Sequence, residues 1–155
     1  MEKGNRGFTL VELMVVIALV GVLSSGVSIG VPAFQRFLDR ERLRTDTRRV
    51  LQTIQNARQN AIIEGFEHRV YVNSATNRIY IRKYTPEHPP AKVVEVPGDI
   101  RIVNNHFSSG FSLYPIGTVS KGGHITFESR RGHHVTIVVQ IGSGRIYMKD
   151  GMMYE

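Results

Sequence analysis

The chain has 155 residues, enough for one modest domain beside a membrane segment, and its formal net charge of +7 permits anionic partners such as nucleic acid or acidic lipid headgroups. It contains no cysteine, which excludes a disulfide framework and a thiolate metal site. The hydrophobic fraction of 41% is ordinary for a globular protein, so the information lies in how residues are distributed along the chain.

An apolar run of 24 residues, 8–31, lies near the N-terminus, and its only charged residue is Glu12. A helix rising about 1.5 Å per residue crosses a hydrocarbon layer of about 30 Å over this length. The run therefore predicts one transmembrane helix. Lys3 and Arg6 precede it and favour a cytoplasmic N-terminus, with the rest of the chain on the opposite side of the membrane.

Glu12 is the unexpected residue of this run. A carboxylate inside a membrane helix costs on the order of 2–3 kcal/mol unless a partner compensates its charge. If the chain is cut between Gly7 and Phe8, the new α-amine is a cation that can pair with Glu12 of a neighbouring copy. We therefore predict that Glu12 promotes assembly between subunits.

The stretch GFTLVELMVVIALVGVLSS, residues 7–25, resembles the class III signal of type IV pilins and pseudopilins. The shared features are a Gly before the cut, a Phe as first mature residue, a Thr second and a Glu fifth. The resemblance implies a leader of residues 1–7, cleavage after Gly7 by a prepilin peptidase and N-methylation of Phe8. It also implies packing of residues 8–31 in a filament core with other pilins or pseudopilins, in which Thr9 and Glu12 serve assembly.

Beyond the apolar run, residues 32–65 continue the helix as an amphipathic segment. Pro32 lacks an amide hydrogen and should kink or loosen the helix where it stands. Apolar residues then recur at the spacing of one buried helical face, namely Leu43, Val50, Ile54, Ala57 and Ala61. Gly65 is the predicted C-terminal cap. A single helix from Phe8 to Glu64 would be about 85 Å long.

Four arginines spaced four residues apart, Arg36, Arg40, Arg44 and Arg48, form a basic stripe on the predicted helix. The stripe either contacts acidic lipid headgroups or acidic filament neighbours, or is a solvated face balanced by Asp39, Glu41 and Asp46. We favour the solvated face, because a run of charges on a helix surface is usually exposed to water and its ion pairs contribute little to stability.

After Gly65 the apolar period changes from helical to alternating, which is typical of strands. A hairpin is predicted around the turn NSATN, and Pro-rich residues 85–90 form a loop. The fold class is therefore α+β: a long N-terminal helix, its first half transmembrane, packed on a C-terminal antiparallel β domain of two sheets that covers residues 66–155. The predicted strands are 69–72, 78–82, 92–96, 100–103, 111–113, 124–128, 133–141 and 145–148.

The segments GHITFESRRG, VTIVVQI and GSGRIYM in this half are similar to the H-type minor pseudopilins of type II secretion and related minor pilins, the GspH/FimT-like group. In the DNA-binding minor pilins of this group, a Gly-Arg-x-Arg motif contacts phosphate. Here Gly144 and Arg145 match, but Tyr147 stands in place of the second Arg. Arg145 therefore either binds phosphate, together with Arg130 and Arg131, or simply closes a hairpin.

A second basic stretch alternates with tyrosines on one predicted strand. Arg78, Tyr80, Arg82 and Tyr84 share one strand face, with Lys83 beside them. Such a face can stack bases while it neutralises phosphates. The competing interpretation, which we favour, is that these side chains cover the sheet with their apolar stems.

The sequence offers no recognisable catalytic or metal constellation. His133 and His134 are neighbours on a predicted strand and point to opposite faces, while His124 could converge with His106 or His134. Ser112 lacks the nucleophile elbow, and no paired carboxylates stand in a catalytic context. We expect no enzyme activity, no metal and no cofactor.

Together these features predict a minor pseudopilin, a filament subunit of a type II secretion system whose β domain faces the periplasm and meets other minor pseudopilins or secreted cargo. The alternative is a minor pilin of a type IV pilus, either one that binds DNA for uptake in natural transformation or one with no ligand of its own. Both classes need the same helix and the same Glu12, so the sequence leaves them open.

Overall fold

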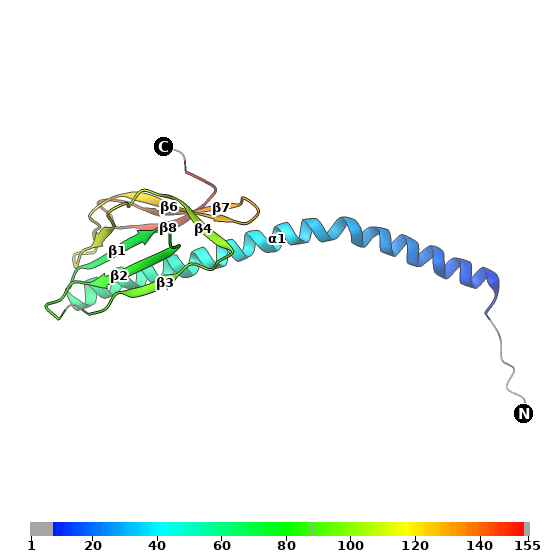
Figure 1. Cartoon of the computed structure of the whole chain (residues 1–155), viewed down its shortest axis with the longest axis horizontal. Helices are drawn as coiled ribbons and strands as arrows, with labels where there is room; N and C mark the ends of the chain where they lie inside the picture. Colours follow the sequence, from blue (N-terminus) through cyan, green and yellow to red (C-terminus); the bar gives the residue numbers. More distant parts are fainter. Residues whose placement is uncertain (1–7, 88, 154–155) are drawn as a thin grey trace, which may run out of the picture. The chain divides into compact units, whose positions relative to one another are not determined.

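The computed structural model describes residues 8–87 and 89–153, apart from the side chains of residues 25–30. A single helix, α1 (Leu10–Glu64), is followed by eight strands (Figure 1). The strands are β1 (His68–Asn73), β2 (Arg78–Lys83), β3 (Lys92–Glu95), β4 (Ile100–Asn105), β5 (Phe111–Leu113), β6 (Gly123–Ser129), β7 (His134–Val139) and β8 (Ile146–Asp150). The predicted α+β class is confirmed.

The chain divides into two compact units, one ending at Leu38 and one beginning at Asp39. In the first unit, α1 is helical from Leu10 and remains unbroken through Pro32. Pro32 therefore does not end the helix, and a kink at this residue stays a prediction. The described large apolar side chains of this unit from Phe8 to Phe37 are exposed and form no core with one another.

In the second unit, α1 packs one face into the core. The five residues predicted for this face, from Leu43 to Ala61, are all buried. Thr47, which the apolar pattern did not reveal, is buried on the same face four residues after Leu43. The helix ends as predicted at Gly65, whose φ of 72° suits glycine and whose N–H donates to the Ala61 carbonyl at 3.1 Å.

The first sheet has the order β3-β2-β1-β5 and contains the predicted hairpin. Its register places Val70 opposite Ile81 and Val72 opposite Ile79, so all four side chains face the core. The hairpin turn ends at Asn77, which has a φ of 54°. Its side-chain amide donates to the Ile100 carbonyl at 2.6 Å and accepts from the Ile102 N–H at 3.0 Å, which joins this turn to β4.

The second sheet has the order β4-β6-β7-β8, and every strand pair is antiparallel. Strand β4 is longer than predicted because a register shift between Ile102 and Asn104 lets pairing continue to Asn105. The prediction that Ile141 extends the buried face of β7 is wrong. The strand ends at Val139, and Ile141 lies in a turn before Gly142, 62% exposed.

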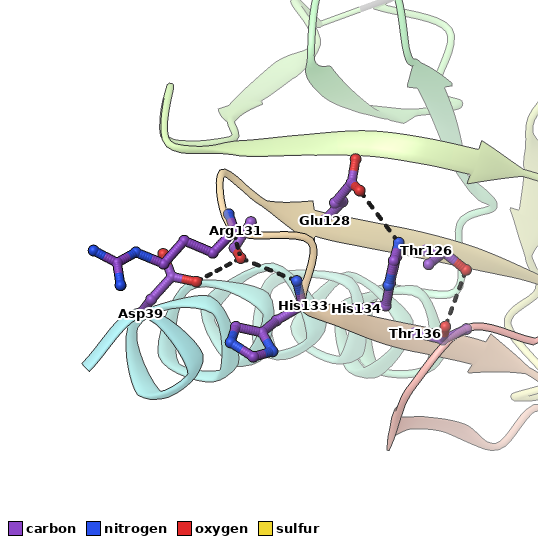
Figure 2. A network of polar contacts seen from close by, with 8 residues as sticks. Asp39, Thr126, Glu128, Arg131, His133, His134 and Thr136 are labelled. Atoms are coloured by element: carbon purple, nitrogen blue, oxygen red, sulfur yellow. Dashed lines mark hydrogen bonds and ion pairs between the residues drawn. The ribbon is translucent and has the colours of Figure 1, made fainter. Parts of the chain in front are cut away.

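Specific hydrogen bonds tie the second sheet and the β5–β6 connection to α1 within the second unit. The Gln55 amide donates to the Ile146 carbonyl and Arg58 Nε donates to the Gly117 carbonyl, each at 2.8 Å. At the other end of β7, the Ser129 hydroxyl donates to the Asp39 carboxylate at 2.6 Å, in the network that Figure 2 shows. These bonds fix the position of the turns at both ends of the second sheet.

Candidate functional site

The first candidate site is the beginning of α1. Gly7 and the leader lie outside the described residues, and Phe8 is 82% exposed. Thr9 is the N-cap of the helix: its hydroxyl accepts from the Glu12 N–H at 3.3 Å, and its carbonyl accepts from the Leu13 N–H at 3.2 Å. The predicted assembly residues Thr9 and Glu12 are thus joined by one local hydrogen bond.

Glu12 stands in the first turn of α1, where the helix dipole favours a negative charge. Its carboxylate forms no ion pair or side-chain hydrogen bond with any residue that the structure describes. The side chain is exposed, so a cation supplied by another molecule can reach it. This geometry fits the predicted pairing with the α-amine of a neighbouring subunit.

The side chains of residues 13–23 form an apolar surface around the helix, called here the apolar sheath. Every large apolar side chain from Leu13 to Leu23 is at least half exposed, and these side chains lie on all faces of the helix. Such a continuous apolar surface marks a region that contacts lipid or other protein. Among the described residues, however, no helix combines the length and the apolar character that a membrane crossing requires.

The predicted phosphate-binding arginines do not form one patch. Arg130 and Arg131 lie in the turn between β6 and β7, whereas Arg145 lies in the turn between β7 and β8. These turns stand at opposite ends of β7, whose six residues span about 20 Å. Arg78, Arg82 and Lys83 lie on β2 in the other sheet.

Three of these basic side chains form ion pairs within the chain. Arg78 pairs with Glu95 at 2.8 Å across β2 and β3, and Arg130 pairs with Asp99 at 2.6 Å. Lys83 contacts Glu64 at 2.5 Å. This hydrogen bond, more than the Coulomb attraction of Lys83 and His68, holds the pKa of the Glu64 carboxyl below its ordinary value, although burial opposes the shift.

Arg145 closes a hairpin through its backbone, which was the structural alternative. Its carbonyl accepts from the Gln140 N–H at 2.9 Å, and its N–H donates to the Ser143 hydroxyl at 3.3 Å. The preceding Gly144 has a φ of 62°, and a Cβ there would collide with the Gly117 carbonyl. The Gly-Arg pair therefore has a structural role in this turn.

The basic-aromatic face of β2 contains a partner that the sequence analysis missed. Arg69, on β1, lies over the Tyr71 ring at 5.4 Å and is directly opposite Arg82. Hydrogen bonds that Tyr71 and Arg69 donate lower the pKa of the Tyr84 hydroxyl, and the bond that Arg69 donates to Tyr84 is the main cause of a raised pKa for Arg69. Burial raises the pKa of Tyr71. Tyr71, Tyr84 and Arg69 therefore form one hydrogen-bonded cluster.

The arginine stripe on α1 is partly paired, as the solvated-face interpretation predicted, but with a different acid. Arg40 and Arg44 reach Asp150 at the end of β8, at 3.6 and 3.3 Å. Only the Arg44 contact with Glu41, at 3.6 Å, lies within the helix. Asp150 was not recognisable from sequence, because it lies more than 100 residues from both arginines.

The described histidines lie in separate places and not in one cluster. His106 and His124 have ring centroids 5.5 Å apart, whereas His134 contacts Glu128 at 3.4 Å (Figure 2). Within the described parts of the chain, no group of three His, Asp or Glu side chains could hold a metal ion.

Comparison with known proteins finds a family motif at the N-terminus and several curated relatives. Residues 3–28 match the family model of the prokaryotic N-terminal methylation motif. Two fimbrial proteins of Pseudomonas aeruginosa are each 38% identical to the chain over 76 residues, which make up 48% of this chain and 44% of each relative. Prepilin peptidase-dependent protein D of Escherichia coli K12 is 44% identical over 68 residues, 44% of this chain and 41% of that relative. The chain thus spans less than half the length of the curated relatives it matches.

The fold matches two solved structures of the minor pseudopilin EpsH from the type II secretion system of Vibrio cholerae. Each has a TM-score of 0.57 at 10% identity, and the matches cover 70% and 76% of this chain and 96% and 99% of the solved chains. The chain therefore combines the N-terminal methylation motif with a pilin-like fold, a long helix on two antiparallel sheets.

One functional signal in this pilin-like chain could have been read from its sequence. Residues 9–12, TLVE, have the Ser/Thr-x-x-Glu pattern of a capping box, which predicts Thr9 as an N-cap. The motif was interpreted only through its resemblance to the prepilin signal. The structure adds the capping role of Thr9 at the same residues.

Proposed function

We propose that this type IV pilin-like protein is a minor pseudopilin, a filament subunit of a type II secretion system. The observation that carries the proposal is the combination of the methylation motif with a β domain whose fold is that of EpsH. The protein acts by assembly and not by catalysis. Its precursor sits in the inner membrane with a cytoplasmic N-terminus and a periplasmic β domain, and a prepilin peptidase cleaves it after Gly7 and methylates Phe8.

Assembly follows from two features of the first unit. The apolar sheath of α1 lacks cover from its own chain, so extraction from lipid is favourable only where neighbouring helices replace the lipid. Glu12 has an exposed carboxylate that needs a cation in that apolar environment, and cleavage before Phe8 creates one. The β domain then meets other minor pseudopilins or secreted cargo.

The test of processing is the intact mass of the protein purified from cells with and without the prepilin peptidase. Loss of Met1 to Gly7 together with one added methyl group is the expected result. An uncut chain in the presence of an active peptidase would overturn the proposal, and the β domain would then be a tethered binding module.

A minor pilin of a type IV pilus is the second candidate, favoured by the likeness to fimbrial proteins of Pseudomonas aeruginosa. Deletion of the gene in its own host separates the two: loss of protein secretion with normal pili supports the secretion assignment, and the reverse supports the pilus.

DNA uptake stays a prediction. Its candidate arginines lie in three separate places, so a gel shift should show weak, strongly salt-dependent binding that no single Arg→Ala change abolishes.

A further inference from the structure

We propose that a pocket between α1 and the first sheet binds a carboxylate carried on a small apolar body. The pocket lies in the second unit and has a volume of about 250 Å³. Asn56 and Asn60 of α1, His68 of β1, Lys83 of β2 and Lys92 of β3 supply its polar groups. This site is remote in sequence from the assembly segment at Phe8 to Glu12, so the inference goes beyond the proposed function.

The charge of the pocket is positive. None of the described residues that line it is acidic. Lys92 lies on the edge strand β3, is exposed and has no ion-pair partner among the residues that the structure describes. An ammonium group beside an apolar surface attracts an anion more strongly than one in open water, because the local dielectric is lower.

The second ammonium group is held in place by its neighbours. Lys83 Nζ lies 2.5 Å from the Glu64 carboxylate and 4.8 Å from the centroid of the Phe66 ring. Glu64 therefore neutralises Lys83, and Lys92 provides the uncompensated charge of the pocket. Removing the charge of Glu64 should increase the attraction for an anion, whereas removing the charge of Lys92 should decrease it.

Three further polar groups can orient the ligand. His68 is buried, and its Nδ1 lies 3.2 Å from the Phe66 carbonyl. Because a carbonyl only accepts, Nδ1 carries the proton, and Nε2 of the neutral ring can accept a hydrogen bond from an N–H of the ligand's body. Asn56 and Asn60 are one helical turn apart, and their side-chain amides have no hydrogen-bond partner within the described chain.

Most of the remaining pocket lining is apolar and limits which ligands fit. Ala57, Ile81 and Pro90 present apolar surface to the pocket. A carboxylate with a short aliphatic or aromatic body fits both this wall and the polar groups, whereas an inorganic anion would leave the apolar wall uncovered. Such a group is available from an acidic segment of a protein partner or from a free small carboxylic acid.

The test uses the isotope-labelled full-length chain in detergent micelles and NMR titration. The first ligand pair is N-acetylphenylalanine and its amide, which differ only in the carboxylate. The second pair is the blocked dipeptides acetyl-Phe-Glu-amide and acetyl-Phe-Gln-amide. We expect the two acids, up to about 20 mM, to shift resonances of Asn56, Asn60 and His68, and the two uncharged ligands to leave them in place.

Three variants sharpen the test. Lys92→Met should weaken binding of N-acetylphenylalanine about tenfold, as expected for loss of a charge-assisted hydrogen bond. Glu64→Gln should strengthen it several-fold, since Lys83 is then uncompensated. Lys149→Met is the matched control, because Lys149 lies on β8, the edge strand of the other sheet, and should not change binding.

The outcomes separate the two sources of the carboxylate. Binding of the Glu dipeptide at least as tight as that of N-acetylphenylalanine points to an acidic protein segment, and binding of N-acetylphenylalanine alone points to a free acid. Equal shifts by acid and amide, no shift with either acid, or equal effects of Lys92→Met and Lys149→Met would each overturn the proposal.

Discussion

Thr9 and Glu12 are joined by one hydrogen bond at the start of α1, yet we expect them to have different roles. Changing Glu12 to Gln keeps the size of the side chain and removes its charge. We expect at least a tenfold decrease in the fraction of protein found in sheared filaments, equivalent to about 1.4 kcal/mol, because the neighbouring α-amine loses its partner. Immunoblots of filament and membrane fractions measure this ratio.

Thr9→Ala is the matched control for that change. It removes the cap, at a cost of about 1 kcal/mol in helix stability, but leaves the carboxylate in place. Assembly of the Thr9 variant should therefore decrease much less than that of the Glu12 variant, and intact masses should show that both variants are processed. A Glu12→Gln protein that enters filaments at the normal level would exclude the salt bridge.

Gly144 and Gly142 lie in the same turn and allow steric collision to be separated from backbone strain. Both have positive φ, of 62° and 84°, so alanine at either position costs roughly 1–2 kcal/mol. Only at position 144 would the new Cβ also collide with the Gly117 carbonyl. Denaturant unfolding should show a loss of about 3 kcal/mol or more for Gly144→Ala and at most half of that for Gly142→Ala. Equal losses would mean that the turn moves freely away from Gly117.

At the scale of elements, the ion pair of Glu64 with Lys83 connects the end of α1 to β2. Because Lys83 lowers the pKa of Glu64 in the folded protein, the pair stabilises the fold above the ordinary carboxyl pKa and loses this contribution as the pH falls through the lowered value. Lys83→Met should raise the pKa of Glu64 toward its ordinary value, which a carbon-detected NMR titration measures.

Arg78→Met is the control for this titration. It breaks a second ion pair of β2, with Glu95, and should leave the pKa of Glu64 unchanged. The acid-dependent loss of stability should be smaller in the Lys83 variant than in the Arg78 variant. If both variants show the same titration of Glu64, the contact with Lys83 does not control its pKa.

The elements that were predictable from sequence are those with strong local patterns. The buried face from Leu43 to Ala61 and the hairpin around residues 73–78 follow from periods of 3.6 and 2. The end of β4 was not predictable, because its pairing to Asn105 depends on a register shift between Ile102 and Asn104. Ile141 was misplaced because alternation alone does not reveal where a strand stops at a turn.

The candidate sites were likewise predictable from sequence only where their residues form a local motif. Phe8, Thr9 and Glu12 form a local motif and were found together. The pairing of Arg40 and Arg44 with Asp150, and the pocket around Lys92, bring together residues from distant segments. Their assembly depends on the sheet order, which no local pattern contains.

At the scale of the whole molecule, the two units differ in whether their apolar side chains are buried. Every buried apolar residue of the described chain lies between Leu43 and Ile146, in the second unit. In the first unit, the described large apolar side chains from Phe8 to Phe37 are exposed. We therefore expect residues 39–155 to form a monomer that unfolds cooperatively without detergent, whereas the full chain requires detergent. Light scattering and thermal unfolding test both statements.

Two leucines of the same helix sharpen this expectation. Leu43 is fully buried and Leu23 is 72% exposed. Leu43→Ala should lower the unfolding free energy of the full chain by about 2–5 kcal/mol, since it leaves a cavity in the core. Leu23→Ala should leave that free energy nearly unchanged, because its side chain is exposed, but should reduce retention in membranes and filaments if the proposed assembly holds. A large loss of fold stability from Leu23→Ala would show that the first unit is covered by its own chain.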